Sequence, residues 1–347
     1  MRRMKTSKAR VQKNAFFKHP SFKRVAIAVG IFLLFIYINN SSYLTKDRDG
    51  NGGPFLVAHR GLGQTFSMEG IDGDTCTAER IFEPEHPYLE NTIPSMEAAF
   101  EAGADQVELD IRPTKDGQFA VFHDWTLDCR TDGSGEPKEY TMAELKQLDI
   151  GYGYTADNGK TYPFRGQGIG LMPSLAEVFD HFPGEAFLIH IKSNEAEEGV
   201  QLARFLANLS EMERENITVY GGDEPVAAFK ELLPEVAVMS KATMKSCLIP
   251  YLAAGWSGYI PSACEKTLLL IPEKYAPWLW GWPNKFLTRM ETVGTQVVIV
   301  AGGGRWSEGY DTVEDLERLP KDFRGGIWTN RIDRIAPEFQ NNQKVEE

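Results

Sequence analysis

The strongest structural signal in this chain lies at residues 103–124, which read GADQVELDIRPTKDGQFAVFHD. Two apolar runs, at 106–111 and 119–123, are separated by the turn-like sequence TKDG at 114–117. Short apolar runs bounded by Gly, Pro and Asp are typical of β-strands, and so short a turn favours pairing of neighbouring strands. We therefore expect the run at 119–123 to be the hairpin partner of the run at 106–111.

The rest of the chain contains more apolar runs of this length, at longer spacing. Further apolar runs of strand length lie at 55–59, 186–191, 217–220, 236–240, 258–260, 296–301 and 325–328. Amphipathic stretches of helical period separate them, and this alternation is typical of repeated βα units. With the hairpin partner set aside, eight strands remain. The prediction is an α/β fold, a (β/α)8 TIM barrel at 55–340, with a doubly wound open sheet as the alternative.

Two long segments interrupt this pattern, at 62–89 after the first strand and at 125–172 after the second strand and its hairpin. Both are rich in Gly, Thr, Asp and aromatic residues. Long segments of this kind in a compact domain are often functional, so we expect these insertions to lie over the mouth of the barrel.

The N-terminal region differs from the rest in charge and hydropathy. Residues 1–24 hold nine basic and no acidic side chains, and an apolar run begins at residue 25. We predict a basic tail at 1–24, one transmembrane helix at 25–44 and a linker at 45–54. The tail is expected in the cytoplasm, because basic segments that flank a transmembrane helix tend to stay on the cytoplasmic side. The barrel would then lie on the extracytoplasmic side of a single-pass membrane protein. A cleaved signal peptide is the alternative reading.

The remainder of the chain is strongly acidic, with 28 basic against 49 acidic side chains, a net charge of −21. A surface of that sign repels nucleic acid, so no nucleic-acid partner is expected. Four cysteines without C-x-x-C spacing argue against a zinc site built from them. Outside the cytoplasm they can form disulfides, and we expect Cys76 to pair with Cys129, because both lie in loops beside the strands described above.

Chemically versatile side chains stand at the ends of the predicted strands. His59, His123 and His190 each follow or end an apolar run, and in a barrel those strand ends converge on one face. Glu108 and Asp110 are two residues apart on one strand, so their carboxylates share a face. Two buried carboxylates repel each other, and either a shared proton or a divalent cation relieves that repulsion; we expect magnesium or calcium.

Two basic residues suit an anionic ligand at the same face. Lys192 lies two residues after His190, and Arg60 directly follows His59. Lysine supplies a point charge and arginine a planar fork, and both are common phosphate ligands.

The order of these motifs resembles the glycerophosphodiester phosphodiesterase family. The matching motifs run in chain order as HRG at 59–61, ENT at 90–92, GADQVELD at 103–110, TKDG at 114–117, VFHD at 121–124, MPSL at 172–175 and WTNR at 328–331. The resemblance implies a metal-dependent barrel hydrolase that releases glycerol 3-phosphate and an alcohol from small-molecule or lipid phosphodiesters. It also implies that His59 and His123 are the general acid and base, around a metal held by Glu108 and Asp110, with Glu90 as a further metal ligand or as a partner of one.

The chain departs from the family pattern at two positions. Where relatives carry a metal-binding glutamate, this chain has His190, which would bind the metal through nitrogen. This change should weaken the binding of the expected magnesium or calcium and favours softer ions, so manganese and zinc are the alternatives. Asn330 replaces an aspartate, so no catalytic role is assigned to it. The tryptophan-rich stretch 277–283 is expected to hold an acyl chain, to touch the bilayer interface or to pack on the barrel. Alternatives to the leading function are a lysophospholipase D-like or other phospholipid phosphodiesterase, and a silent barrel used for binding.

Overall fold

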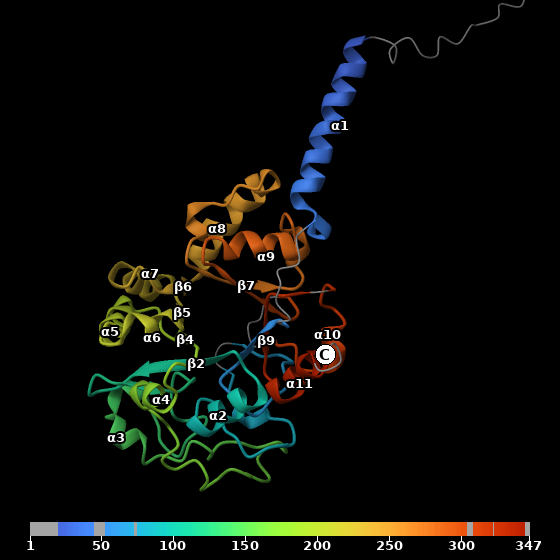
Figure 1. Cartoon of the computed structure of the whole chain (residues 1–347). Helices are drawn as coiled ribbons and strands as arrows, with labels where there is room; N and C mark the ends of the chain where they lie inside the picture. Colours follow the sequence, from blue (N-terminus) through green and yellow to red (C-terminus); the bar gives the residue numbers. More distant parts are fainter. Residues whose placement is uncertain (1–19, 45–52, 73–74, 304–307, 322, 344–347) are drawn as a thin grey trace, which may run out of the picture.

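A computed structural model describes residues 20–44, 53–72, 75–303, 308–321 and 323–343 of the chain. It shows a barrel domain from which one long helix, α1 (Pro20–Asn40), projects (Figure 1). Most of the predicted basic tail at 1–24 and of the linker at 45–54 falls outside the described residues. The 18-residue window Lys23–Asn40 of α1 is apolar and long enough to cross a membrane, and none of it is buried in the protein.

Eight parallel strands and one antiparallel strand form the sheet, within the described part of the chain. The parallel strands run in the spatial order β6-β5-β4-β2-β1-β9-β8-β7, and a bridge between Val238 and Thr267 nearly closes the ring. The strands are β1 (Phe55–Ala58), β2 (Gln106–Pro113), β3 (Phe119–Val121), β4 (Phe187–Ile191), β5 (Ile217–Gly221), β6 (Ala237–Met239), β7 (Leu268–Pro272), β8 (Gln296–Val300) and β9 (Gly326–Thr329). The predicted (β/α)8 barrel is therefore confirmed, and the open-sheet alternative is not observed.

The hairpin is confirmed, and one strand prediction is wrong. β3 pairs antiparallel with β2, with Ile111 opposite Val121. The seventh barrel strand is β7 at 268–272 and not the run at 258–260. That run cannot extend as a strand because Gly258 has a left-handed φ of 91° and caps a short 3-10 helix, whereas the four apolar residues that begin β7 are all buried.

The helices cover the outside of the barrel. The longer ones are α2 (Ile93–Ala102), α4 (Leu175–His181), α5 (Ala196–Leu206), α7 (Asp223–Leu232), α8 (Lys241–Ala254), α9 (Asn284–Glu291) and α11 (Ile332–Gln343). Single turns are α3 (Met142–Leu145), α6 (Glu211–Glu215) and α10 (Val313–Leu316), with 3-10 turns η2 (Ser42–Leu44), η3 (Ala78–Arg80), η4 (Pro137–Glu139), η5 (Gly255–Ser257), η6 (Ser262–Cys264) and η7 (Ala276–Trp278). α2 begins at the capping box of Thr92 and Ser95 and ends at Gly103, whose φ is 109°.

The two insertions pack against each other beside the barrel. Buried side chains from both, among them Ile81, Leu127, Leu145 and Tyr154, form a hydrophobic cluster of their own. The predicted disulfide between Cys76 and Cys129 is present and joins the two insertions, with a Cα–Cα distance of 5.7 Å. A second disulfide joins Cys247 to Cys264.

Candidate active site

The predicted site residues gather at the carboxyl ends of three neighbouring strands. His59 follows β1, Glu108 and Asp110 lie on β2, His190 lies on β4 and Lys192 follows it. β2 stands between β1 and β4 in the sheet, and Asp110 lies directly opposite His190 in register. Parallel pairing therefore brings together residues that are more than 100 positions apart in the chain.

Glu108, Asp110 and His190 form a compact set of ligand atoms, all within 4.8 Å of one another. His190 Nδ1 lies 2.9 Å from Asp110 Oδ1, and the hydroxyl of Tyr220 donates to Glu108 Oε1 at 2.5 Å. Both carboxylates are completely buried. Burial and the neighbouring Asp110 carboxylate raise the pKa of Glu108, whereas Lys192, His123 and Arg60 outweigh burial and lower the pKa of Asp110.

The set of two carboxylate oxygens and one imidazole nitrogen fits a divalent cation. Burial and the neighbouring Asp110 both disfavour a negative charge on Glu108, and a cation bound between the two carboxylates would offset this cost. Nitrogen from His190 in place of a third oxygen suits manganese or zinc at least as well as magnesium or calcium.

Arg60 is the central cation of the site. Its Nη1 donates to Glu90 at 2.8 Å and its Nε lies 3.2 Å from Asp110 Oδ2. Arg60 is buried, and although burial disfavours its charge, the three surrounding carboxylates raise its pKa overall. Glu90 therefore lies against Arg60 and is not a member of the compact ligand set.

Two residues of the site adopt left-handed backbone conformations that are rare outside glycine. Arg60 has φ 58° and Asn91 has φ 59°. Asn91 contacts Asp110 twice, donating from Nδ2 to the carboxylate at 3.0 Å and accepting from the Asp110 backbone amide at 3.0 Å. Backbone strain of this kind costs on the order of 1–3 kcal/mol and concentrates at functional sites.

His59 is oriented by a residue that the sequence left without a role. Its Nδ1 lies 2.6 Å from Asn330 Oδ1, while Asn330 Nδ2 donates to Asp311 at 2.8 Å. Because Asp311 accepts from the amide nitrogen, the amide oxygen faces His59 and requires a proton on Nδ1. Nε2 of His59 is then unprotonated, and burial lowers the pKa of this histidine well below its usual value.

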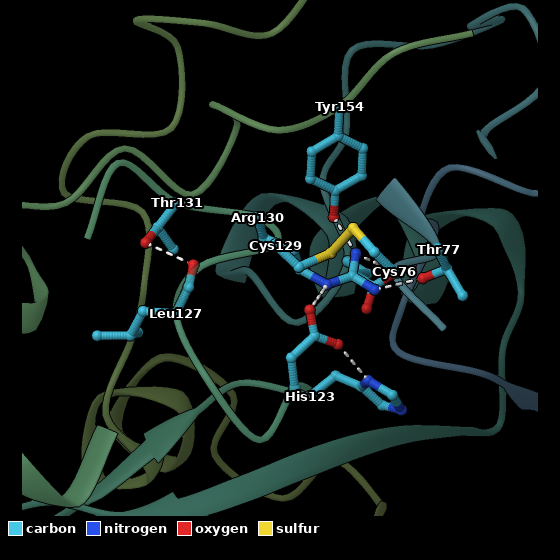
Figure 2. Close-up of a disulfide and its surroundings, with 10 residues drawn as sticks. Cys76, Thr77, His123, Leu127, Cys129, Arg130, Thr131 and Tyr154 are labelled. Atoms are coloured by element: carbon cyan, nitrogen blue, oxygen red, sulfur yellow. Dashed lines mark hydrogen bonds and ion pairs between the residues drawn. A yellow bond between two sulfur atoms is a disulfide. The ribbon is translucent and has the colours of Figure 1, made fainter. Parts of the chain in front are cut away.

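His123 is held in the same way by a carboxylate. Its Nδ1 lies 2.7 Å from Asp124 Oδ1, and Asp124 Oδ2 accepts from Arg130 Nε at 2.8 Å. Burial and the charges of Arg60 and Lys192 lower the pKa of His123 to about 4. Figure 2 shows the His123 ring and Arg130 on the two sides of this carboxylate.

Arg130 is the residue that the sequence reasoning missed most completely. It is buried, and besides Asp124 it contacts the Tyr154 hydroxyl at 2.6 Å, Thr77 Oγ1 at 2.5 Å and Glu90 at 3.2 Å. The Cys76–Cys129 disulfide joins the residues that directly precede Thr77 and Arg130 (Figure 2). The sequence did offer one signal for Arg130, which is its position directly after Cys129 of the predicted disulfide. That bond fixes the positions of the two residues that follow its cysteines.

A hollow of about 570 Å³ lies beside the small pocket that reaches His59 and Arg60. Gln64, Phe66 and Asn330 border both this pocket and the hollow. Its other described lining side chains combine apolar Met68 and Phe82 with charged groups. The volume lies in the range of ligand pockets, so the hollow can take the part of a ligand that extends away from His59.

Comparison with known proteins gives one family throughout. Residues 59–223 match the model of the glycerophosphoryl diester phosphodiesterase family. A glycerophosphodiester phosphodiesterase of Caldanaerobacter subterraneus subsp. tengcongensis is 41% identical over 103 residues, which cover 30% of this chain and 39% of that protein. Lysophospholipase D GDPD1 of Homo sapiens is 30% identical over 138 residues, 38% of this chain and 40% of that protein. The matches thus span about two fifths of these relatives.

Solved structures agree on the fold. An Oleispira antarctica phosphodiesterase, solved in complex with the product sn-glycerol-3-phosphate, superposes with a TM-score of 0.51. The superposition covers 85% of this chain and 97% of that one, at 19% sequence identity. At this identity the likeness supports the barrel fold alone.

Proposed function

Because this chain belongs to the glycerophosphoryl diester phosphodiesterase family, we propose that it hydrolyses glycerophosphodiesters to glycerol 3-phosphate and an alcohol. The observation that carries the proposal is that six side chains converge at one end of the barrel, namely His59, Arg60, Asp110, His123, His190 and Lys192. This arrangement supplies each group that phosphodiester cleavage needs: proton carriers, cations for the phosphate and a site for a metal ion.

In the proposed reaction the glycerol 2-hydroxyl attacks phosphorus. One histidine removes its proton, and an oxygen–phosphorus bond forms. The other histidine takes up a proton on Nε2 when the anionic substrate binds, and it donates this proton to the leaving oxygen as the bond to the alcohol breaks. Water then opens the cyclic phosphate with the two proton roles reversed. His59 and His123 suit these roles because each has Nδ1 held by a fixed partner, which leaves Nε2 for the substrate.

The reaction also requires that the negative charge of the phosphoryl group be stabilised. Arg60 and Lys192 would bind its oxygens, and Glu108, Asp110 and His190 would hold a divalent cation. When bound, that cation stabilises the negative charge that grows on the phosphoryl oxygens. Glu90 would act through Arg60, which it holds with a 2.8 Å contact.

The experiment measures release of glycerol 3-phosphate from glycerophosphocholine by the full chain in detergent, after chelation and after separate return of magnesium, calcium, manganese or zinc. Metal-dependent release supports the proposal and identifies the ion that His190 favours. Absence of release with all four ions, in protein that remains folded by circular dichroism, would contradict it.

A lysophospholipid substrate is the second candidate. Two observations favour it: the apolar side chains of Phe66, Met68 and Phe82 along the hollow, and the similarity to a lysophospholipase D. We further propose that α1 anchors the chain in a membrane, which would place the barrel close to such lipids. Release of choline from lysophosphatidylcholine faster than from glycerophosphocholine would select this candidate.

A further inference from the structure

One segment of the barrel domain has an unusual composition. Residues 246–264 read SCLIPYLAAGWSGYIPSAC and contain no charged side chain, although 25% of the whole chain is charged. The disulfide between Cys247 and Cys264 joins the two ends of the segment. Ile249, Leu252 and Tyr259 are exposed, to 63%, 44% and 55%. Several exposed apolar side chains within one uncharged segment favour an interaction surface.

The segment is bonded to the last turn of α1. Asn39 and Asn40 both donate from Nδ2 to the Trp256 carbonyl, at 3.1 and 2.8 Å. The buried Arg289 of α9 donates to the Asn39 carbonyl at 2.8 Å and to the Gly255 carbonyl at 3.0 Å. The end of the helix and the segment therefore form one connected unit. Figure 1 shows α8 and α9 on the side of the barrel from which α1 projects.

The depth of α1 in a bilayer fixes the depth of this segment. The apolar window Lys23–Asn40 is 18 residues long, about 27 Å at 1.5 Å per residue, close to the ~30 Å of a hydrocarbon core. Phe32 lies eight residues before Asn40, and its ring contacts the Trp256 ring at 5.4 Å. If α1 crosses the core, Trp256 reaches past Asn40 towards the bilayer interior. Tryptophan is enriched at the membrane interface, which is the level of Asn39 and Asn40 at the end of this window, where the Trp256 backbone is bonded.

The tryptophan-rich stretch at 277–283 adjoins the same surface. Trp280 Nε1 donates to the Leu252 carbonyl at 2.8 Å, and Ser42 Oγ, just after α1, donates to the Gly281 carbonyl at 3.2 Å. Trp278 in this stretch is 78% exposed. An exposed indole beside an uncharged surface is typical of a membrane interface.

We propose that one surface of the barrel domain sits in the interface of the bilayer that α1 crosses. This lipid-facing surface consists of Ile249, Leu252, Trp256, Tyr259 and Trp278. The barrel is then held against the membrane at two places and does not hang from a flexible tether. The proposal rests on the membrane anchor proposed above and not on the catalytic assignment. The bilayer is the expected partner because the surface continues the unburied apolar helix α1.

The test uses the full chain in phosphatidylcholine vesicles with or without bromine on the acyl chains, which quenches nearby tryptophans. We expect Trp256→Phe and Trp278→Phe each to reduce the fraction of tryptophan fluorescence that bromine quenches. Trp125→Phe is the matched control, because Trp125 is 50% exposed and stacks on Arg112, away from the surface. Its removal should not reduce the quenched fraction.

Equal quenching in all three variants and the unchanged chain would overturn the proposal, as would failure of the chain to float with the vesicles. Turnover of soluble glycerophosphocholine by the same vesicles is measured separately. A chain that is quenched but inactive would contradict the catalytic proposal and leave the lipid contact supported.

Discussion

His123 would act in the proposed reaction through the ring nitrogen that Asp124 leaves free. With its pKa lowered to about 4, the imidazole is neutral at pH 7 in the unliganded protein and ready to accept a proton. Asp124 stabilises the charged ring that then forms, because its carboxylate accepts from Nδ1 at 2.7 Å. The carboxylate is itself held by Arg130, so it cannot turn away.

Replacement of His123 should therefore abolish most turnover without unfolding the chain. General acid-base catalysis contributes roughly 10²–10⁴-fold, so we expect kcat of His123→Asn to fall by about that factor. The control is His181→Asn, because the exposed His181 ends α4 and contacts Glu97 and the Phe182 ring, outside the candidate site. Steady-state rates of both variants on glycerophosphocholine provide the measurement. Turnover retained in His123→Asn would contradict the acid-base assignment.

Asp124 should also make the free energy of unfolding depend on pH. Arg130 and His123 outweigh the effect of burial and lower the pKa of Asp124 well below its usual value near ~4. A carboxyl group whose pKa is lower in the folded state stabilises the fold above its unfolded pKa, and this stabilisation is lost as the pH falls below about 4.

The free energy of unfolding should accordingly fall by about 1.5–3 kcal/mol in Asp124→Asn at pH 7, the usual range for hydrogen bonds to charged groups. The difference from the unchanged chain should shrink below about pH 4. Urea unfolding at a series of pH values measures it, with the exposed Asp180→Asn on α4 as the control. A difference that stays constant with pH would show that the charge of Asp124 is not the cause.

The two disulfides differ in what they connect. Cys76–Cys129 joins the insertions and adjoins the Thr77–Arg130 contact, which continues through Asp124 to the candidate base or acid His123. Cys247–Cys264 instead closes the uncharged segment at the outside of the barrel. One bond therefore supports the site, and the other supports a surface remote from it.

Removing each disulfide by paired serine substitution should separate stability from catalysis. Loop closure predicts losses of about 4 kcal/mol for Cys76–Cys129 and about 3 kcal/mol for Cys247–Cys264. We expect kcat to fall only in the Cys76→Ser, Cys129→Ser variant, because Arg130 loses its fixed position. Detergent-solubilised protein, unfolded in urea and assayed on glycerophosphocholine at a temperature where both variants are folded, gives the two values. Equal kcat in both variants would exclude the positioning role.

At the scale of the whole molecule, the candidate metal site links strands that come from distant parts of the chain. Glu108 and Asp110 belong to β2 and His190 to β4, and these strands pair along five residue positions. A cation that binds only the folded barrel would stabilise all of it. At a concentration 100 times its Kd, a ligand of this kind adds about 2.7 kcal/mol.

The melting temperature should therefore fall after chelation and rise when manganese or zinc is returned. We expect His190→Glu to shift this stabilisation towards magnesium and calcium, because a carboxylate is a harder ligand than imidazole. Differential scanning fluorimetry with each ion measures the shift. Lys241→Glu on the exposed start of α8 controls for a general effect of added negative charge. An unchanged order of ions in His190→Glu would show that position 190 does not contact the metal.

The sequence by itself determined the barrel, its hairpin and the residues at its strand ends. Strand and helix periodicity are local properties, and parallel βα units place every strand end on one face. The apolar window of α1 and the Cys76–Cys129 pair were predicted for similar local reasons. The seventh strand was misplaced because a three-residue apolar run before a bend carries too little periodic signal, and the local backbone at Gly258 prevents extension.

Only the tertiary structure decided which side chains hold the predicted ones in place. Arg130, Tyr220 and Asn330 contact the site from segments that lie far apart in the chain. It also separated Glu90, which pairs with Arg60, from the ligand set of Glu108, Asp110 and His190. The physical reason is that such contacts depend on loop closure and strand register, whereas the pattern of apolar residues records only which face of each element is buried.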